Sequence, residues 1–597
     1  MVYVVGVSSG FFGVAEARER PELAGLFKKA QTSITKGVNF VQLDLESTAE
    51  FEEPNLKEKM KKDIREKLGV SYGIHSETKA AGVEAAELDS AIAFEYKRAH
   101  KRIVEILRKS KEIDSKYVLV HSSESEPFPL LERILQTCDL VDFYGRSLSD
   151  FLKENKDLLD WVLGGKKEEI VNSVLEVWKE KGEKITIEDI IATFAKRKIF
   201  PKNFIIGEIW RGATLEGILH SIIVTIVSRE EHYRHKLFKE FSPEEKEEVL
   251  RLLTEELKRE VERMPSELIE FVRSKGLHYG PERIAYYFIA KWMELHKDPL
   301  WEKIVKAAIT FFSAREKKSI EEWLKENNLS LERLTIDDEN FRARYELWVP
   351  AVSAKYIFGH FFPISVEYED PKKYLDPMIF ALESPFGGRG IEEWYRLSNP
   401  YLYYFLIEEV NKTANKEIFA VALDLEHMLS SKIDPELVAE LWPEEGGKFI
   451  RVIHAGWPST LAPAHLPIKL GSRAQEYLYK VYYKFRLKGF GKDPKKECWI
   501  IFERGPPETF MDSVLALKTI VEFLEKDVPP EKLPLEFYGI SPTGVFAEER
   551  QLATIKEHAY EPLRDLLVLP EEIHGLFGRA AIEKGVSPEK WKKEELR

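Results

Sequence analysis

The chain has 597 residues, of which 89 are Lys or Arg and 102 are Asp or Glu, so its formal net charge is −13. Hydrophobic residues make up 44% and aromatic residues 12% of the chain, which is enough for a packed core and excludes intrinsic disorder. No stretch approaches about 18 uncharged apolar residues and the start MVYVVGVSSG is not a secretory leader, so we expect a cytoplasmic protein without membrane contact.

Eight short apolar runs, each typical of a buried β-strand, recur along the chain. Segments of helical character follow them, and this alternation predicts parallel strands joined by helices. The runs are residues 3–8, 39–45, 70–76, 117–122, 377–383, 417–424, 449–454 and 497–503. Eight such units fit an α/β fold of the TIM type, a (β/α)8 barrel, better than an open sheet, because no glycine fingerprint for a dinucleotide follows the first run.

One interval between strands is far longer than the others. His121 and Glu383 are 262 residues apart, about 220 more than one strand and helix need. We therefore predict a mostly helical insertion at 140–370, between the barrel halves 1–139 and 371–597. Its clearest helix begins at Ser242, where a capping box precedes an apolar face. The loop after a barrel strand lies at the catalytic end, so we expect this module to overhang the site, where it can bind a protein partner.

Two cysteines, Cys138 and Cys498, exclude a disulfide framework and a thiolate zinc site, so any metal must be bound by His, Asp and Glu. Charged residues, mostly Lys and Glu, make up 32% of the chain, a composition typical of thermophilic proteins.

At the end of each of the third to eighth runs, the last or next-to-last residue is a potential metal ligand. Each of them alone also fits a side chain that bonds a loop backbone, and it is the set that indicates a site. Several acidic side chains at the mouth of a barrel are costly unless cations neutralise them. Oxygen and imidazole ligands suit Zn, with Mn, Co and Fe(II) as alternatives. The six predicted ligands are His75, His121, Glu383, Asp424, His454 and Glu503.

Two short motifs connect these residues to a known family. ALESPFGGRG (381–390) resembles a Glu-x-x-x-Gly-x-Gly turn, with Arg389 in place of the second glycine, and ALDLEH (422–427) resembles an Asp-x-x-His motif. Together with His454 and Glu503 in the same order, they resemble the xylose-isomerase-like barrels, which include endonuclease IV and the sugar isomerases and epimerases. The resemblance covers about 360 residues, everything except the predicted insertion.

The early strands distinguish the two branches of that superfamily. The sugar branch holds its metal on the later strands, whereas endonuclease IV adds a His on the third and fourth strands, as His75 and His121 do here. The resemblance therefore implies a dinuclear centre in which Glu383 bridges two ions. It also implies a third metal on His427 and His465, but Pro463 replaces the expected Asp of that loop. We thus expect two or three metal ions per chain.

The substrate is less clearly indicated. Acidic residues follow the second strand (Glu46, Glu50, Glu52, Glu53) and the fourth (Glu124, Glu126), which disfavours a nucleic-acid backbone. Several residues after the later strands are candidates for contact with a phosphate, a base or a sugar, although each also fits an ordinary surface or packing role. These substrate candidates are Arg389, Trp457, Lys469, Arg473 and Arg504.

Three functions remain open from the sequence. The first is a metal-dependent phosphodiester hydrolase resembling endonuclease IV, acting on nucleic acid or a smaller phosphate ester. The second is a metal-dependent isomerase or epimerase of a sugar or sugar phosphate. In both, Glu383, Glu503 and His427 are the candidates for catalytic groups. The third is a non-catalytic, metal-bearing barrel that binds a partner protein.

Overall fold

The computed structural model describes residues 2–10, 25–34, 38–76, 86–123, 140–163, 282–385, 396–456, 467–503 and 510–540. Its strands form a closed barrel in the order β1-β2-β3-β4-β5-β6-β7-β8, so the predicted TIM-type barrel is confirmed. The strands are β1 (Tyr3–Ser8), β2 (Phe40–Asp44), β3 (Ser71–His75), β4 (Tyr117–His121), β5 (Ile379–Glu383), β6 (Phe419–Asp424), β7 (Ile450–Ala455) and β8 (Cys498–Phe502).

The described residues fall into two compact units. One, the terminal unit, comprises Met1–Gly10, Thr32–Val41 and Asp424–Arg597, and the other, the central unit, comprises Phe11–Gln31 and Gln42–Leu423. In the terminal unit, β8 pairs in parallel with β1 and with β7. In the central unit, β4 pairs in parallel with β3 and β5, and β5 pairs with β6. Almost every strand residue is buried, as expected for strands covered by helices.

The helices of the central unit include four before β4 and several between β4 and β5. The basic stretches at 57–66 and 97–102 are helical. The central helices are α2 (Leu26–Ile34), α3 (Leu56–Glu58), η3 (Lys59–Glu66), α4 (Ala93–Glu112), α6 (Leu148–Glu154), α7 (Lys156–Leu163), α13 (Glu282–Leu295), α14 (Pro299–Arg315), α15 (Ile320–Glu326), α16 (Glu339–Arg342), α17 (Tyr345–Phe361) and α18 (Pro400–Ala414).

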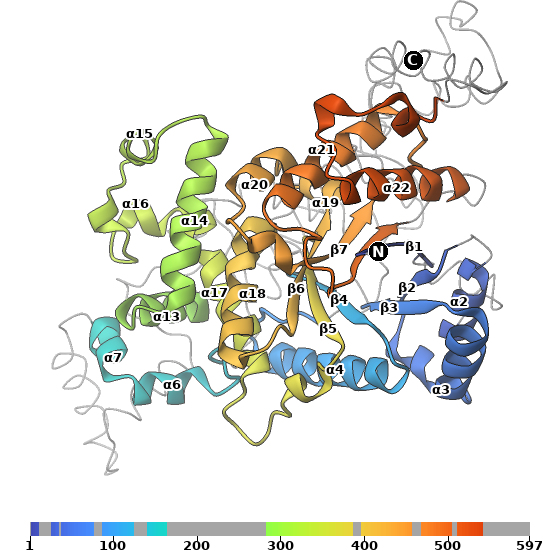
Figure 1. Cartoon of the computed structure of the whole chain (residues 1–597). Coiled ribbons are helices and arrows are strands. Elements are labelled where there is room, and N and C mark those ends of the chain that lie inside the picture. Colours follow the sequence, from blue (N-terminus) through green and yellow to red (C-terminus); the bar gives the residue numbers. More distant parts are fainter. Residues whose placement is uncertain are drawn as a thin grey trace, which may run out of the picture. The chain divides into compact units, whose positions relative to one another are not determined.

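Helices α14, α17 and α18 lie side by side and carry much of the core of this unit (Figure 1). Phe361, at the end of α17, contacts Phe380 of β5 and Phe419 of β6 with ring centroids 4.8 and 4.6 Å apart. The described part of the region 140–370 is thus helical, as predicted. That it forms a separate module remains a prediction, and the helix expected at Ser242 lies outside the described residues.

The terminal unit contains α19 (Leu425–Ser430), α20 (Pro435–Leu441), α21 (Arg473–Leu487) and α22 (Phe510–Glu525). Arg486 of α21 holds the start of β1 in place. Its guanidinium donates to the Tyr3 hydroxyl at 2.9 Å and to the Gly491 carbonyl at 3.0 Å, and it makes two bonds to Asp527. Among the described residues, no helix is long and apolar enough to cross a membrane.

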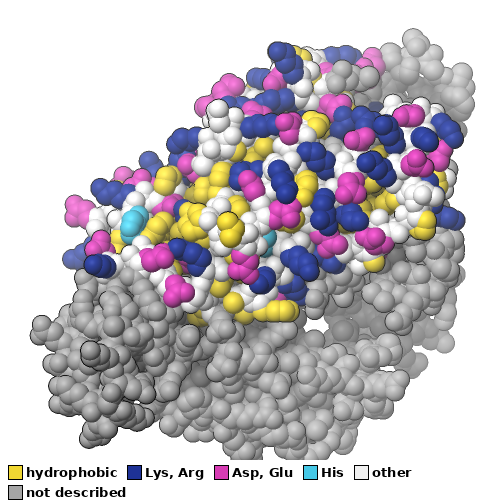
Figure 2. Space-filling view, turned by 90° about the horizontal axis from the view of Figure 1, so that it is seen from below, with side chains coloured by type: hydrophobic (Ala, Val, Ile, Leu, Met, Phe, Trp, Pro, Cys, Tyr) yellow, Lys and Arg dark blue, Asp and Glu magenta, His cyan; other side chains and the backbone are white. Residues whose placement is uncertain are grey.

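The described charged surface is mixed in sign. On the face shown in Figure 2, Lys and Arg side chains are interspersed with Asp and Glu. The ion pairs Lys97 to Glu367 and Lys109 to Glu52 on α4 are examples.

Candidate metal centre

The six predicted ligands lie at or next to the carboxyl ends of six consecutive strands, β3 to β8. This position follows from the strand pattern, because a short apolar run ends where the chain reaches its first polar, loop-forming residue. All six side chains are buried, although all six are polar. Their exposed fractions are His75 1%, His121 9%, Glu383 0%, Asp424 2%, His454 1% and Glu503 6%.

The first set of ligands, on β3 to β5, lies within the central unit. The register of β4 and β5 places His121 directly beside Glu383. Atom Oε2 of Glu383 lies 3.3 Å from Nε2 of His75 and 3.7 Å from Nε2 of His121. The two imidazole rings stand edge to face with centroids 5.4 Å apart. Two imidazole nitrogens therefore converge on one carboxylate oxygen.

The proton on Nδ1 of His75 is fixed by the next residue in the chain. Its Nδ1 atom lies 2.8 Å from the main-chain oxygen of Ser76, which can only accept a hydrogen bond. Nδ1 therefore carries the proton, and in the neutral ring Nε2 presents its lone pair to Glu383. A lone pair and a carboxylate oxygen at this distance repel each other unless a cation lies between them. The pair is thus suited to share a metal ion, and a carbonyl that fixes the other ring nitrogen is typical of metal-binding His.

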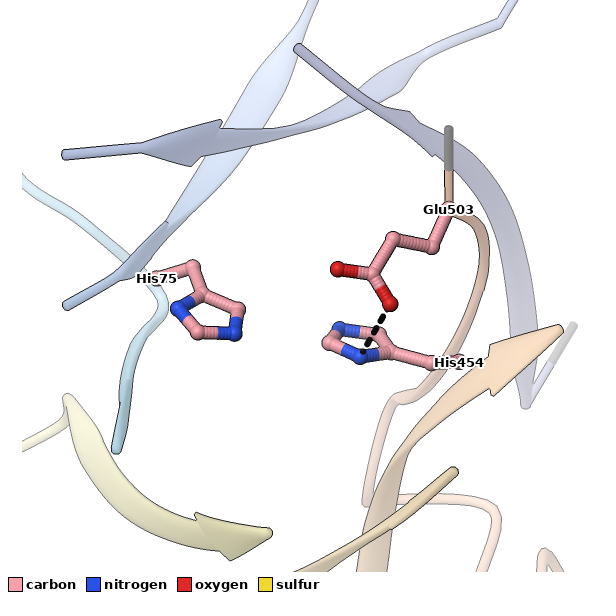
Figure 3. Close-up of side chains that lie close together, drawn as sticks. All are labelled: His75, His454 and Glu503. Atoms are coloured by element: carbon pink, nitrogen blue, oxygen red, sulfur yellow. Dashed lines mark ion pairs between the residues drawn. The ribbon is translucent and has the colours of Figure 1, made fainter. Parts of the chain in front are cut away.

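The second set, on β6 to β8, lies within the terminal unit. Here the imidazole nitrogen that faces the acids is Nδ1 of His454. It lies 3.1 Å from Oε2 of Glu503 and 3.9 Å from Oδ2 of Asp424. Figure 3 shows His454 and Glu503 pointing toward each other, with the ion pair as a dashed line, and draws His75 in the same view. This set combines one imidazole with two carboxylates.

The two carboxylate oxygens of Asp424 make different contacts. Oδ1 accepts a hydrogen bond from the main-chain nitrogen of His427 at 2.9 Å and so caps the amino end of α19. Oδ2 faces His454 and also lies 3.7 Å from Nε2 of His427. The Asp-x-x-His spacing thus gives a carboxylate that is oriented by its own helix, with a second imidazole one helical turn away.

The distances within each set fit donors that share one ion. Metal bonds of about 2.1 Å place neighbouring donors roughly 3.0 to 3.4 Å apart, and the shortest contacts of the two sets are 3.3 and 3.1 Å. Within the central unit, the donor atoms of His75, His121 and Glu383 all lie within 4.8 Å of one another. Within the terminal unit, those of Asp424, His454 and Glu503 meet the same limit.

The donor chemistry agrees with the geometry. Three imidazoles and three carboxylates, without a thiolate, are a ligand set for Zn, Mn, Co or Fe(II). Burying three carboxylates is costly, and bound cations offset that cost. The buried His and carboxylate clusters can therefore hold metal ions.

The other predicted site residues have mixed outcomes. His427 is buried beside Asp424, whereas Lys469 and Arg473 are exposed near the amino end of α21. Four further residues lie outside the described part of the chain, so their roles stay predictions, and so does the third metal. These are Arg389, Trp457, His465 and Arg504.

The acidic loop after β2 differs from its sequence-based interpretation. Its glutamates do not form an uncompensated negative patch, because lysines pair with them. Lys29 lies 2.9 Å from Glu50 and 3.9 Å from Glu46. Glu53 lies 2.9 Å from Lys59, and Glu52 lies 2.9 Å from Lys109. The pairing weakens the objection to an anionic substrate that this loop raised, while Glu124 and Glu126 lie outside the described residues.

Sequence reasoning missed one polar residue at a strand end. Asp44 is the last residue of β2, has an exposed fraction of 0%, and accepts a hydrogen bond from Nε2 of Gln42 at 3.0 Å. The signal was present in VQLDL, where Gln42 and Asp44 share one face of a strand, because alternate residues point the same way.

The fold and these clusters define the class: a closed (β/α)8 barrel with His and carboxylate groups able to bind divalent metal at the carboxyl ends of its strands. Comparison with family models, curated proteins and solved structures finds no match to this chain. The function must therefore be argued from the site.

Proposed function

We propose that this protein is a metal-dependent hydrolase of phosphodiester bonds, acting on nucleic acid or a smaller phosphate ester through a dinuclear centre. The observation that carries the proposal is the presence of two ligand sets. His75, His121 and Glu383 offer three donors on β3 to β5, and Asp424, His454 and Glu503 offer three on β6 to β8. A single ion would leave one of these buried sets without a cation.

The early strands favour hydrolysis over isomerisation. In the superfamily that this chain resembles, an isomerase holds its metal on the later strands only. His75 and His121 would therefore have no function in an isomerase. Both histidines direct Nε2 at the same oxygen of Glu383, an arrangement that ordinary packing does not require. Endonuclease IV, which this chain resembles at those positions, uses both. By the same resemblance, Glu383 is the candidate for the carboxylate that bridges two ions.

Bound metal ions would lower the pKa of a water molecule and stabilise the attacking and leaving oxygens of an in-line displacement. The residues of this chain set up that chemistry. The Ser76 carbonyl keeps Nε2 of His75 available, and α19 orients Asp424. Glu503, which belongs to the second set, and His427, which is buried beside it, are the candidates for moving a proton to or from the substrate. Zinc is the metal we expect, with Mn, Co and Fe(II) as alternatives.

A second candidate function is a sugar or sugar-phosphate isomerase or epimerase. The observation that favours it is the loop after β7, where Pro463 stands in place of the Asp that endonuclease IV uses for its third metal. In that function one ion on the second set would polarise a carbonyl, and a carboxylate or His would move the proton.

The deciding experiment combines metal analysis with two assays. Purified protein is analysed for bound metal and tested on bis(p-nitrophenyl) phosphate, on a DNA duplex with an abasic site, and on aldose and ketose sugars. The proposal predicts two or more ions per chain and phosphodiester cleavage. One ion with sugar isomerisation would select the second candidate, and absence of any bound metal under saturating zinc would refute both.

The variant His75→Ala sharpens the comparison. It should remove one ion and abolish cleavage in a dinuclear hydrolase, whereas an isomerase with one ion on β6 to β8 would keep its metal and its activity. His100→Gln is a matched control, because His100 is also a buried imidazole of the central unit but lies on α4 and contacts His360. Equal metal loss in both variants would show a general folding defect.

A further inference from the structure

Asp44 is placed beside the first ligand set by the pairing of β2 with β3. The main-chain nitrogen of Leu45 donates to the carbonyl of His75 at 2.9 Å. The equivalent bond between β4 and β5 runs from the main-chain nitrogen of Ser122 to the carbonyl of Glu383 at 2.8 Å, and there His121 and Glu383 are register partners. By this pattern Asp44 is the register neighbour of His75. Register neighbours in a parallel sheet direct their side chains to the same face.

A chain of hydrogen bonds holds the carboxylate of Asp44 in one orientation. Oδ1 of Asp44 accepts from Nε2 of Gln42 at 3.0 Å, and Oε1 of Gln42 accepts from the Tyr117 hydroxyl at 2.9 Å. Gly73 of β3 provides the space for this chain, because a Cβ atom there would lie 2.3 Å from the Tyr117 ring. Since a carboxylate only accepts and a phenol can donate, the amide of Gln42 has a single consistent orientation.

The main chain of Asp44 is anchored as well. Nζ of Lys29, which is 2% exposed, donates to the main-chain oxygen of Asp44 at 2.6 Å and bonds Glu50 at 3.1 Å. The end of β2 is therefore fixed through its main chain as well, and two buried polar side chains, from β2 and β4, serve to orient one carboxylate. Such a network is costly to build unless each member is satisfied, and its last member lies next to a predicted metal ligand.

A metal site with three protein ligands keeps a position for water, and that water needs a hydrogen-bond acceptor. Asp44 is absent from the groups whose donor atoms lie within 4.8 Å of one another, so direct coordination is not its role. We propose that Asp44 is a positioning residue of the first set: its carboxylate accepts a hydrogen bond from the water held beside His75, with Gln42 and Tyr117 setting its direction. This inference rests on the proposed metal centre.

One consequence concerns the substrate. The negative charge of Asp44 disfavours a phosphate or carboxylate group at the position beside His75 and favours a neutral donor there, either water or a substrate hydroxyl. An ion on the first set would therefore bind the attacking water or hydroxyl rather than the anionic group of the substrate.

The test uses the full-length protein loaded with Co²⁺, whose visible spectrum reports on the ligands and water around the ion. Asp44→Asn keeps the shape of the side chain and removes its charge, and it should weaken Co²⁺ binding by about 10- to 100-fold and change the spectrum. Tyr117→Phe keeps the charge and loosens its orientation, so it should alter the spectrum with a smaller loss of affinity. Asp44→Glu should recover part of the affinity that Asp44→Asn loses.

Tyr72→Phe is the matched control. Tyr72 is a buried phenol on β3, next to Gly73 and so on the opposite face of the strand, and its hydroxyl bonds the carbonyl of Ile113. The variant Tyr72→Phe should leave the Co²⁺ affinity and the visible spectrum unchanged. If wild-type protein binds no Co²⁺, the metal centre itself is refuted. If wild type binds it and Asp44→Asn and Tyr117→Phe match wild type in affinity and spectrum, only the role of Asp44 is refuted.

Discussion

Replacing Glu383 with Gln separates metal binding from packing at the centre of the first ligand set. The side chain is fully buried, and its Oε2 atom lies within 3.7 Å of two imidazole nitrogens. Glutamine has nearly the same volume, so the cavity is unchanged. What is lost is the negative charge and one strong ligand, and the effect of the change should therefore depend on whether metal is present.

The expected magnitude follows from that geometry. Loss of a partner outside the ligand shell typically costs 10- to 100-fold in metal affinity, so loss of a charged ligand should cost about 1000-fold, or about 4 kcal/mol. At a zinc concentration of about 1000 times the wild-type Kd of the first set, the ion bound there stabilises the native wild type by about 4.1 kcal/mol. In the variant at the same concentration, the ion on the first set should contribute only about 0.4 kcal/mol. Without metal, removing a buried charge should leave the variant as stable as wild type or more stable.

Thermal unfolding with and without zinc measures both effects. Wild type should show a metal-induced rise in Tm of several degrees, and Glu383→Gln a clearly smaller one that lacks the contribution of the first set, with equal or higher Tm after chelation. Glu409→Gln is the control, because Glu409 is 9% exposed on α18 and pairs with Lys303 at 3.4 Å. The reasoning is refuted if Glu383→Gln keeps the full metal-induced rise, or if chelated Glu383→Gln is much less stable than chelated wild type.

The strands and six candidate ligands could be predicted from the sequence because two simple rules coincide. Buried parallel strands are short apolar runs, and functional side chains of a barrel follow directly after them. β1 matches its predicted bounds, and the other strands differ by a few residues at their ends. His75 and Glu383, for example, are each the last residue of their strand.

Other features depend on contacts between distant residues and could not be predicted in this way. Nε2 of His75 faces a carboxylate because Nδ1 of that ring bonds the Ser76 carbonyl, whereas in His454 it is Nδ1 that faces a carboxylate. The pairing of Glu50 with Lys29 joins residues from different elements, so the loop looked like an acidic patch in the sequence. Asp44 also ends a strand, but the run VQLDL does not show that its carboxylate is held by Gln42 and Tyr117, because Tyr117 comes from a different strand.

Three further predictions concern packing and pH. Gly73→Ala should lower the free energy of unfolding, measured by chemical denaturation, by about 1–3 kcal/mol, because its new Cβ would lie 2.3 Å from the Tyr117 ring. If Gly73→Ala lowered the free energy of unfolding equally in a Tyr117→Leu background, this cause would be wrong. Arg486→Ala should cost about 3 kcal/mol by the same assay, since it leaves buried bonds unmade, and a change below 1 kcal/mol would contradict it. The last concerns His100 and His360, whose Nδ1 atoms lie 3.1 Å apart and whose pKa values are both lowered by burial. In the unfolded chain the His pKa is near 6.5, so below that pH the unfolded state binds more protons than the native state. The free energy of unfolding should therefore be at its full value above about pH 6.5 and fall as the pH decreases below it. The slope should be at most about 1.4 kcal/mol per pH unit for each ring. His360→Gln should flatten that part of the curve of unfolding free energy against pH, and a variant curve as steep as that of wild type would show that other groups cause the loss.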